Sequence, residues 1–324
     1  MMQKKSIKFY LGLTLKAVLS ILLIFYVLRD VDFDKLLVQL SEASVTMVVA
    51  STFILTLQFV VATARWQAVL GVLGVAMHFM SALKIIFISN FFNQILPSSI
   101  GGDAVRIYKA HKAGLALATS INSVLLERVA TILGLFLLVV AFQPFFMNRG
   151  GDMGPQWLLG ILTIIAFLGT GMLMLLDRLP AKFSRWRLVR GGAKLAQDTR
   201  TVFLNLRHTS YILLLSVFGH INIVVGVWVL GLALGLGEQL TLINSMVLIP
   251  LVLLVTTLPI SIAGWGVREA SMVTAFGFIG IAPENALILS VVFGLQTLVI
   301  ALPGGLVWLG RSDRNIIKAD VFPN

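Results

Sequence analysis

The sequence predicts an all-α polytopic membrane protein, built as an inverted-topology repeat with two re-entrant, broken-helix segments. Of its 324 residues, 58% are hydrophobic and only 12% are charged, and the mean hydropathy is +0.97. These values lie far from those of soluble proteins. Apolar runs of membrane-spanning length alternate with basic stretches, and one short phrase occurs twice, half a chain apart.

The repeated phrase reads Leu-Pro-x-Ser-Ile-small-Gly-x-small-Val-Arg; it begins at Leu96 and again at Leu258, 162 positions later. Proline removes a backbone donor and glycine admits unusual dihedrals, so each copy is expected to break a helix at membrane depth. Backbone groups freed there need protein or water as partners, and paired breaks in two halves point to a binding site. The residues expected to make the breaks are Pro97, Gly101, Gly102, Pro259, Gly264 and Gly266.

The charges of the loops predict how the first half of the chain is oriented in the membrane. Residues 11–28 follow three lysines and have no small-residue cleavage site, so an uncleaved first span starting in the cytoplasm is expected. An acidic stretch with a short interfacial helix follows outside, and residues 45–64 return to Arg65 and Trp66 at the membrane interface. Residues 82–96 are too short to span and are followed by basic residues, so the segment 82–113 is expected to be re-entrant from the cytoplasm.

The second half is expected to run the opposite way. Residues 115–142 and 157–176 cross out and back, and the basic loop from 178 to 207 has one acid, Asp198. Residues 211–234 then lead outward, so a second re-entrant segment, 242–280, enters from outside before residues 286–309 return. We therefore expect a single membrane domain, 1–324, with half-repeats 1–162 and 163–324, in a bacterial or archaeal cytoplasmic membrane with both termini cytoplasmic.

Six ionisable residues fall within apolar segments: Asp103, Arg106, Glu127, Arg128, Arg268 and Glu269. Each costs about 2.5 to 3.5 kcal/mol at a helix centre, so they are expected to face the interior and pair. Asp103 and Arg106 are spaced to interact on one helix, whereas the adjacent Arg268 and Glu269 are expected to have remote partners. Two interpretations stay open: structural ion pairs that lock the broken helices, or an anion site at Arg106 and Arg268 for a lipid phosphate.

Neutral polar residues add a second set of expectations. Asn90, Asn93 and Gln94 precede the first break and are expected to cap it rather than contact a ligand. Four isolated polar residues are expected to make hydrogen bonds between helices. These are Asn122, His220, Asn222 and Gln296.

Several function classes are excluded by what the sequence lacks. The net charge of +11 is explained by cytoplasmic loops, so no nucleic acid partner is expected. There is no Cys, no histidine spacing typical of a metal site, no P-loop and no dinucleotide fingerprint, so neither a metal nor a cofactor is expected. A transporter is favoured over an enzyme, although Asp103 or Glu127 could serve an integral-membrane transferase.

The sequence also resembles the lysylphosphatidylglycerol synthase transmembrane family, called flippase-like or YbhN-like (UPF0104), over residues 10–310. The motifs that carry the resemblance are Arg65-Trp66, Asn93-x-x-Leu96-Pro97, Gly101-Gly102-Asp103-x-x-Arg106, Glu127-Arg128, Pro259-x-Ser261 and Gly264-x-Gly266-x-Arg268-Glu269-Ala270. In the multiple peptide resistance factors, the similar region is a flippase for an aminoacylated phospholipid and precedes a soluble transferase domain. That domain does not follow here, so synthesis of the lipid is not expected.

The resemblance implies a flippase-like transporter of a phosphate-bearing lipid, whether anionic, aminoacylated or polyprenyl. Its partners would be membrane lipids, with homo-oligomers or a lipid-modifying enzyme as further associations. A lipid-phosphate or glycolipid transferase, or its accessory subunit, is the alternative, and a purely structural membrane partner is the third. The expected substrate-binding residues are Arg106, Arg268, Asp103, Glu127, Arg128, Glu269, Asn93, Ser99 and Ser261.

Overall fold

The computed structural model describes residues 38, 41–96, 101–147, 157–178, 187–258, 261 and 263–310, and the regular secondary structure of this part of the chain is all helical. Its helices are α3 (Val45–Val72), α4 (Phe79–Ile95), α5 (Gly101–Lys112), α6 (Leu117–Met147), α7 (Trp157–Leu173), η1 (Leu176–Arg178), α8 (Arg187–Phe203), α9 (Leu206–Ala233), α10 (Leu242–Thr256), α11 (Val267–Gly277) and α12 (Pro283–Leu309). The all-α prediction is confirmed for these ranges. The expected first span, 11–28, lies outside them.

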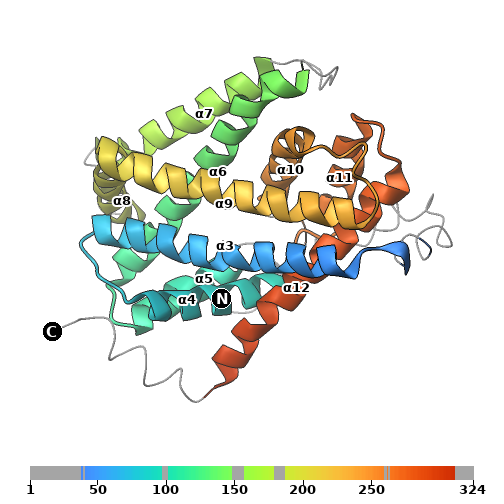
Figure 1. Ribbon diagram of the computed structural model, residues 1–324. Helices are drawn as coiled ribbons and strands as arrows, with labels where there is room; N and C mark the ends of the chain where they lie inside the picture. The colour runs from blue at the N-terminus through green and yellow to red at the C-terminus, as the bar shows by residue number, and fades with distance from the viewer. Residues whose placement is uncertain are drawn as a thin grey trace, which may run out of the picture.

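Helices α3 and α9 form a long antiparallel pair through the middle of the molecule (Figure 1). The backbone amide of Ser44 donates to the Ala233 carbonyl at 3.0 Å, and Asn222 Nδ2 donates to the Ile54 carbonyl at 2.9 Å. Gly226 lets the two backbones approach, because a Cβ there would lie 2.6 Å from Leu55 Cδ2. Small residues at contacts of this kind are typical of helices packed in a membrane.

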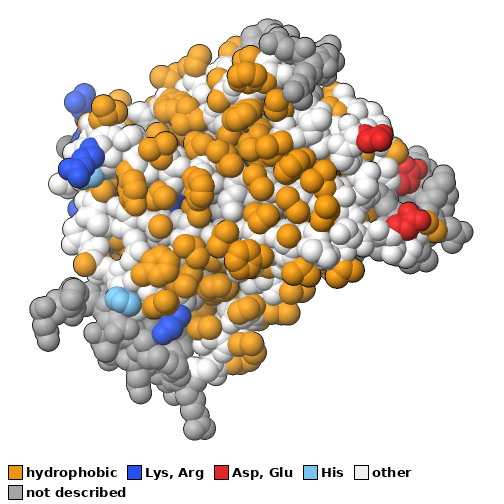
Figure 2. Space-filling view, viewed as in Figure 1, with side chains coloured by type: hydrophobic (Ala, Val, Ile, Leu, Met, Phe, Trp, Pro, Cys, Tyr) orange, Lys and Arg blue, Asp and Glu red, His pale blue; other side chains and the backbone are white. Residues whose placement is uncertain are grey.

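The face of the molecule seen in Figure 2 has two charged ends with an apolar band between them. Figure 2 shows Lys and Arg at the end where α8 lies, Asp and Glu at the opposite end, and hydrophobic side chains between. We call these the basic end (Arg178, Lys194, Arg200, Arg207) and the acidic end (Glu42, Glu238, Glu284). Four described helices, α3, α6, α9 and α12, are long and apolar enough to cross a membrane. The protein is therefore a multi-pass membrane protein.

Each repeated phrase begins just after one short helix and runs into the next short helix. The chain leaves α4 after Ile95 and begins α5 at Gly101, and it leaves α10 after Thr256 and begins α11 at Val267. Within each pair the two short helices pack against each other, α4 against α5 and α10 against α11. Gly264 and Gly266 have φ values of +82° and +81°, which side chains with a Cβ rarely adopt. Pro97, Ser99 and Pro259 lie outside the described residues.

The two halves make matching contacts. A shift of 162 positions places α3 close to α9, α4 to α10, α5 to α11 and α6 to α12. Helix α4 packs on α12 of the other half, and α10 packs on α6 in the corresponding way. Likewise α3 contacts α4 as α9 contacts α10, and α5 contacts α6 as α11 contacts α12.

The basic stretch from 178 to 207 differs from the expected loop, because it contains the helix α8. The prediction of a loop rested on the number of charges and took no account of apolar residues at helical spacing. Three of these apolar residues belong to a small hydrophobic cluster: Leu195, Val202 and Phe203. Its acid, Asp198, is buried and accepts a hydrogen bond from Asn122 Nδ2 of α6 at 2.7 Å. Lys194 Nζ lies 2.9 Å from the same carboxylate.

Candidate functional site

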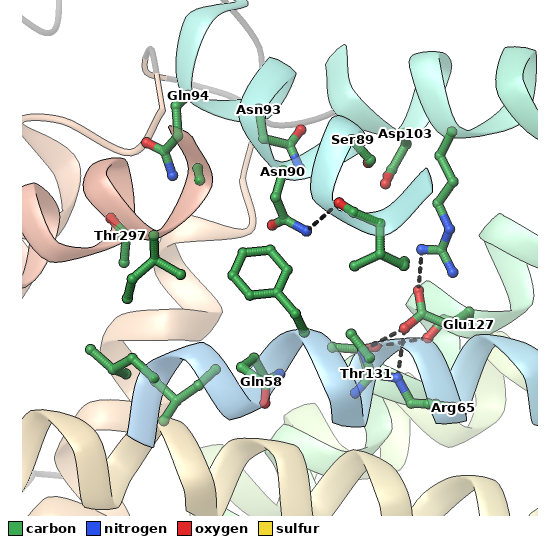
Figure 3. A pocket seen from close by; sticks show the side chains of 18 of the residues that line it. Gln58, Arg65, Ser89, Asn90, Asn93, Gln94, Asp103, Glu127, Thr131 and Thr297 are labelled. Atoms are coloured by element: carbon green, nitrogen blue, oxygen red, sulfur yellow. Dashed lines mark hydrogen bonds and ion pairs between the residues drawn. The ribbon is translucent and has the colours of Figure 1, made fainter. Parts of the chain in front are cut away.

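A cavity of about 310 Å³ lies between α3, α4, α5, α6, α9 and α12 (Figure 3). Five charged residues line it: Arg65, Asp103, Arg106, Glu127 and Arg128. Its neutral polar lining consists of Gln58, Ser89, Asn90, Asn93, Gln94, Thr131 and Thr297. The volume is at the lower end of the range for small-ligand pockets. None of the described residues of α10 or α11 lines it.

Glu127 of α6 joins two arginines inside this cavity. Arg65 Nε donates to Oε1 at 2.6 Å, and Arg106 Nη1 donates to Oε2 at 3.0 Å. All three side chains are buried. The guanidinium carbon of Arg106 also lies 4.2 Å from the centroid of the Trp66 ring. One carboxylate therefore ties α3, α5 and α6 together through charge-assisted hydrogen bonds.

Asp103 pairs with Arg128 of α6 through Nε, rather than with Arg106 on its own helix. The predicted interaction of Asp103 with Arg106 is electrostatic only, while the hydrogen-bonded ion pair of Asp103 is with Arg128. Glu127 and Arg128 are adjacent on α6, and they face Arg106 and Asp103 on α5. Sequence spacing alone could not show this crossed pairing, because it depends on how α5 packs against α6.

Arg65 is a site residue that the sequence reasoning missed, since it placed Arg65 and Trp66 at the membrane interface. In the structure α3 does not end at this pair but continues to Val72, and Arg65 is 5% exposed while Trp66 is fully buried. Trp66 Nε1 donates to Ser123 Oγ at 3.2 Å. The available signal was the mainly apolar stretch after Trp66, which allows the helix to continue.

The cavity carries unused hydrogen-bonding groups. Nη1 of Arg65, and Nε and Nη2 of Arg106, are buried and have no partner among the described residues. The same is true of Oε1 of Gln58. Buried polar atoms are normally paired, so the unpaired arginine donors of residues that line the cavity are an unusual feature of this site. Three arginines against two carboxylates also leave one excess positive charge.

The break between α4 and α5 is capped from α4, as predicted for Asn93. Its Oδ1 accepts from the backbone amide of Gly102 at 2.8 Å, and Ser89 Oγ donates to the Gly102 carbonyl at 2.8 Å. A Cβ at Gly102 would overlap the Ser89 carbonyl oxygen and the Asn93 side chain. Glycine is therefore required where the two helices approach each other.

Arg268 and Glu269 form a separate cluster in which each is the counter-charge of the other, contrary to the expectation, and in which both also bind a remote residue, Ser290 of α12. Arg268 Nη2 donates to Glu269 Oε1 at 2.7 Å, and Ser290 Oγ donates to the same oxygen at 3.0 Å. Glu269 Oε2 accepts from the Gly266 amide at 2.5 Å. The positive φ of Gly266 begins the helix so that the carboxylate folds back over its first turn, within reach of the long arginine side chain.

The candidate site residues therefore divide into two groups. Arg268 does not line the cavity but lies behind Phe293, which does, with its guanidinium carbon 5.7 Å from that ring centroid. Ser261 is buried and is not a lining residue. The structure thus brings together Asp103, Arg106, Glu127, Arg128 and Asn93, and it leaves Arg268, Glu269 and Ser261 outside the cavity.

Replacing Glu269 by Gln is expected to lower the free energy of unfolding by about 1 to 3 kcal/mol, because Arg268 is left buried without its counter-charge. Lipid binding in the cavity is expected to stay unchanged. The measurements are thermal unfolding followed by tryptophan fluorescence and lipid binding to the purified protein. Glu238→Gln, in an exposed turn, is the matched control. Equal melting temperatures of the two variants would show that Glu269 does not stabilise the fold through Arg268.

The isolated polar residues make the interhelical hydrogen bonds predicted for them. Gln296 Nε2 of α12 donates to the Val48 carbonyl of α3 at 3.0 Å, and His220 Nε2 of α9 lies 2.9 Å from the Thr131 carbonyl oxygen of α6. Asn222 and Asn122 bond α9 to α3 and α6 to α8. These contacts fix the helices that surround the cavity.

Comparison with known proteins identifies the family. The family model described as the lysylphosphatidylglycerol synthase TM region matches residues 13–305. A UPF0104 membrane protein of Methanocaldococcus jannaschii is 24% identical over 300 residues, which cover 84% of this chain and 87% of that relative. The matched range includes both breaks, the cavity and the Arg268 cluster. The chain belongs to the lysylphosphatidylglycerol synthase TM region family.

Proposed function

We propose that this protein moves a phosphate-bearing lipid between the leaflets of the membrane, with the phosphate bound at Arg65 and Arg106. One observation carries the proposal: both guanidinium groups are buried beside a cavity and keep N–H donors without a partner among the described residues. Guanidinium groups match the geometry and charge of phosphate oxygens. The family fits a membrane protein with a lipid-related role.

In this proposal the chain is one membrane domain made of two inverted half-repeats, residues 1–162 and 163–324. The antiparallel course of α3 and α9 and the matching contacts of α4 with α12 and α10 with α6 support it. The two broken segments are re-entrant from opposite faces. Rocking of one half against the other would open the cavity to each leaflet in turn.

We further propose that the basic end faces the cytoplasm, in a cytoplasmic membrane, with both termini on that side. The separation of basic and acidic ends in Figure 2 supports this orientation, because Lys and Arg are retained on the cytoplasmic side. The α4–α5 pair would then enter from the cytoplasm, and the α10–α11 pair from outside.

The two halves do not contribute equally to the proposed site. Arg106 corresponds to Arg268 after the shift of 162 positions, but Glu127 corresponds to Leu289 and Arg65 to Val227. The second half therefore lacks the charged lining. We propose that Arg65 and Arg106 bind the headgroup and that Glu127 holds both of them in place. The ion pair of Asp103 with Arg128 joins α5 to α6, and Arg268 and Glu269 brace α11.

The test is lipid movement between leaflets in proteoliposomes. It is measured as the fraction of a fluorescent anionic lipid that a quencher added outside the vesicles can reach over time. Arg106→Gln is expected to slow it roughly tenfold or more, since a charge-assisted hydrogen bond contributes about 1.5 to 3 kcal/mol. Arg207→Gln at the basic end is the matched control. Unchanged movement in Arg106→Gln would contradict the proposal, and a covalently altered lipid would favour the transferase alternative.

A further inference from the structure

Arg106 is held by fewer hydrogen bonds than the two other buried arginines. Among the described residues its guanidinium group donates only through Nη1, to Glu127 Oε2 at 3.0 Å. Arg65 contacts the other oxygen of Glu127 through both Nε and Nη2. Arg268 likewise donates through Nε and Nη2 to Glu269 Oε1, at 3.1 and 2.7 Å. A single hydrogen bond does not fix the plane of a guanidinium group, so Arg106 needs a further constraint.

The ring of Trp66 on α3 supplies that constraint. The guanidinium carbon of Arg106 lies 4.2 Å from the ring centroid, a distance typical of a cation–π interaction. The ring is fully buried, and its Nε1 donates to Ser123 Oγ of α6 at 3.2 Å. Ser123 Oγ in turn donates to the Ser120 carbonyl at 3.1 Å. The ring therefore cannot turn away from Arg106 without breaking a buried hydrogen bond.

Arg106 has an alternative partner on its own helix. Asp103 lies three positions earlier on α5 and attracts Arg106 electrostatically, although its hydrogen-bonded partner is Arg128. Residues three apart on a helix are close enough to pair. A guanidinium group released from the ring could turn to Asp103, and that carboxylate would then take up donors that are unpaired in the structure.

We propose that Trp66 is a positioning residue, whose indole face holds the guanidinium group of Arg106 against Glu127 and keeps Nε and Nη2 unpaired for the anionic ligand. This inference rests on the proposed function, because it assumes that Arg106 binds an anion. Trp66 is not one of the residues that line the cavity, so its effect on the ligand must pass through Arg106.

The second half of the chain contains a similar stack that serves as an internal control. The guanidinium carbon of Arg268 lies 4.7 Å from the centroid of the Trp265 ring. Arg268 is also hydrogen-bonded to Glu269 and Ser290, and it does not line the cavity. Trp265→Leu therefore removes an indole from a buried arginine without touching the proposed anion site, and it is the matched control for Trp66→Leu.

The test is the affinity of the full-length protein in detergent for phosphatidylglycerol, measured as a dissociation constant by native mass spectrometry. Trp66→Leu is expected to weaken binding about threefold to thirtyfold, the range of a cation–π interaction at a buried site. Trp66→Phe keeps an aromatic face and is expected to stay within about threefold of the wild type. Both variants lose the hydrogen bond to Ser123, so that loss cannot explain a difference between them. Trp265→Leu is expected to bind as the wild type does.

A combined variant separates positioning from a merely structural role. In an Arg106→Gln protein, Trp66→Leu is expected to weaken binding no further, because the ring acts through the guanidinium group. A further loss there, Trp66→Phe as weak as Trp66→Leu, or wild-type affinity in Trp66→Leu would overturn the positioning role and leave the proposed function standing. Affinity that ignores Arg106→Gln would overturn the proposed function itself. If Trp66→Leu fails to fold, Trp66→Met makes the same comparison, since it also fills the space without a ring.

Discussion

Replacing Glu127 by Leu is expected to lower the free energy of unfolding by about 3 to 5 kcal/mol, the cost of leaving buried charges without a partner. Glu127 accepts hydrogen bonds from both Arg65 and Arg106, and each of the three side chains is at most 5% exposed. The substitution leaves two adjacent cations that repel each other in an apolar setting. Thermal unfolding of the purified protein, followed by tryptophan fluorescence, measures the loss.

A triple variant separates charge from packing. Arg65→Met, Arg106→Met and Glu127→Leu together remove the whole cluster and keep similar side-chain volume. This variant is expected to recover most of the stability, because replacing a complete buried ion cluster by apolar residues is often close to neutral. It should nevertheless fail to bind anionic lipid. A Glu127→Leu protein as stable as the wild type would show that the cluster does not hold the three helices.

Gly304→Val is expected to lower the free energy of unfolding by about 3 kcal/mol or more and to displace α4 from α12. A Cβ at position 304 would overlap the carbonyl oxygen of Phe87, and backbone atoms of a packed helix cannot move aside cheaply. Because α4 and α12 both line the cavity, the displacement is expected to impair lipid binding as well. Thermal unfolding and lipid titration measure the two effects.

Gly160→Val in α7 is the matched control, because nothing lies within 4 Å of a Cβ built at that position. Both changes add the same side chain to a helix, so the general propensity effect cancels in the comparison. Equal melting temperatures of the two variants would indicate that α4 and α12 can move apart without lowering the free energy of unfolding. The contact would then be a movable surface rather than a fixed one.

Much of the helix arrangement could be read from the sequence, because membrane spans follow from local composition. The range 45–64 became α3 (Val45–Val72), and 286–309 became α12 (Pro283–Leu309). Proline and glycine also located both breaks. The helix α8 within the stretch 178–207 was not predicted. It combines high charge with an apolar stripe, and a count of its charges does not detect that stripe.

The candidate site was only partly readable. Buried charges stand out in an apolar sequence, which identified Asp103, Arg106 and Glu127 as residues of one polar region. Arg65 was missed because it lies near the end of an apolar run, where an arginine normally marks the interface. Arg268 was grouped with Arg106 because both end the repeated phrase, whereas their partners and surroundings differ.

The sequence by itself determined that this is a helical membrane protein, where its helices break, and which charges must be buried, since each depends on the cost of exposing a polar group or charge to lipid. The tertiary structure alone decided which charges meet. Glu127 joins Arg65 and Arg106, Asp103 joins Arg128, and Arg268 turns to its neighbour Glu269, because helix packing brings distant residues within hydrogen-bonding distance. Only that packing leaves buried arginine donors beside a cavity without a partner among the described residues, which is the observation behind the proposed anion site.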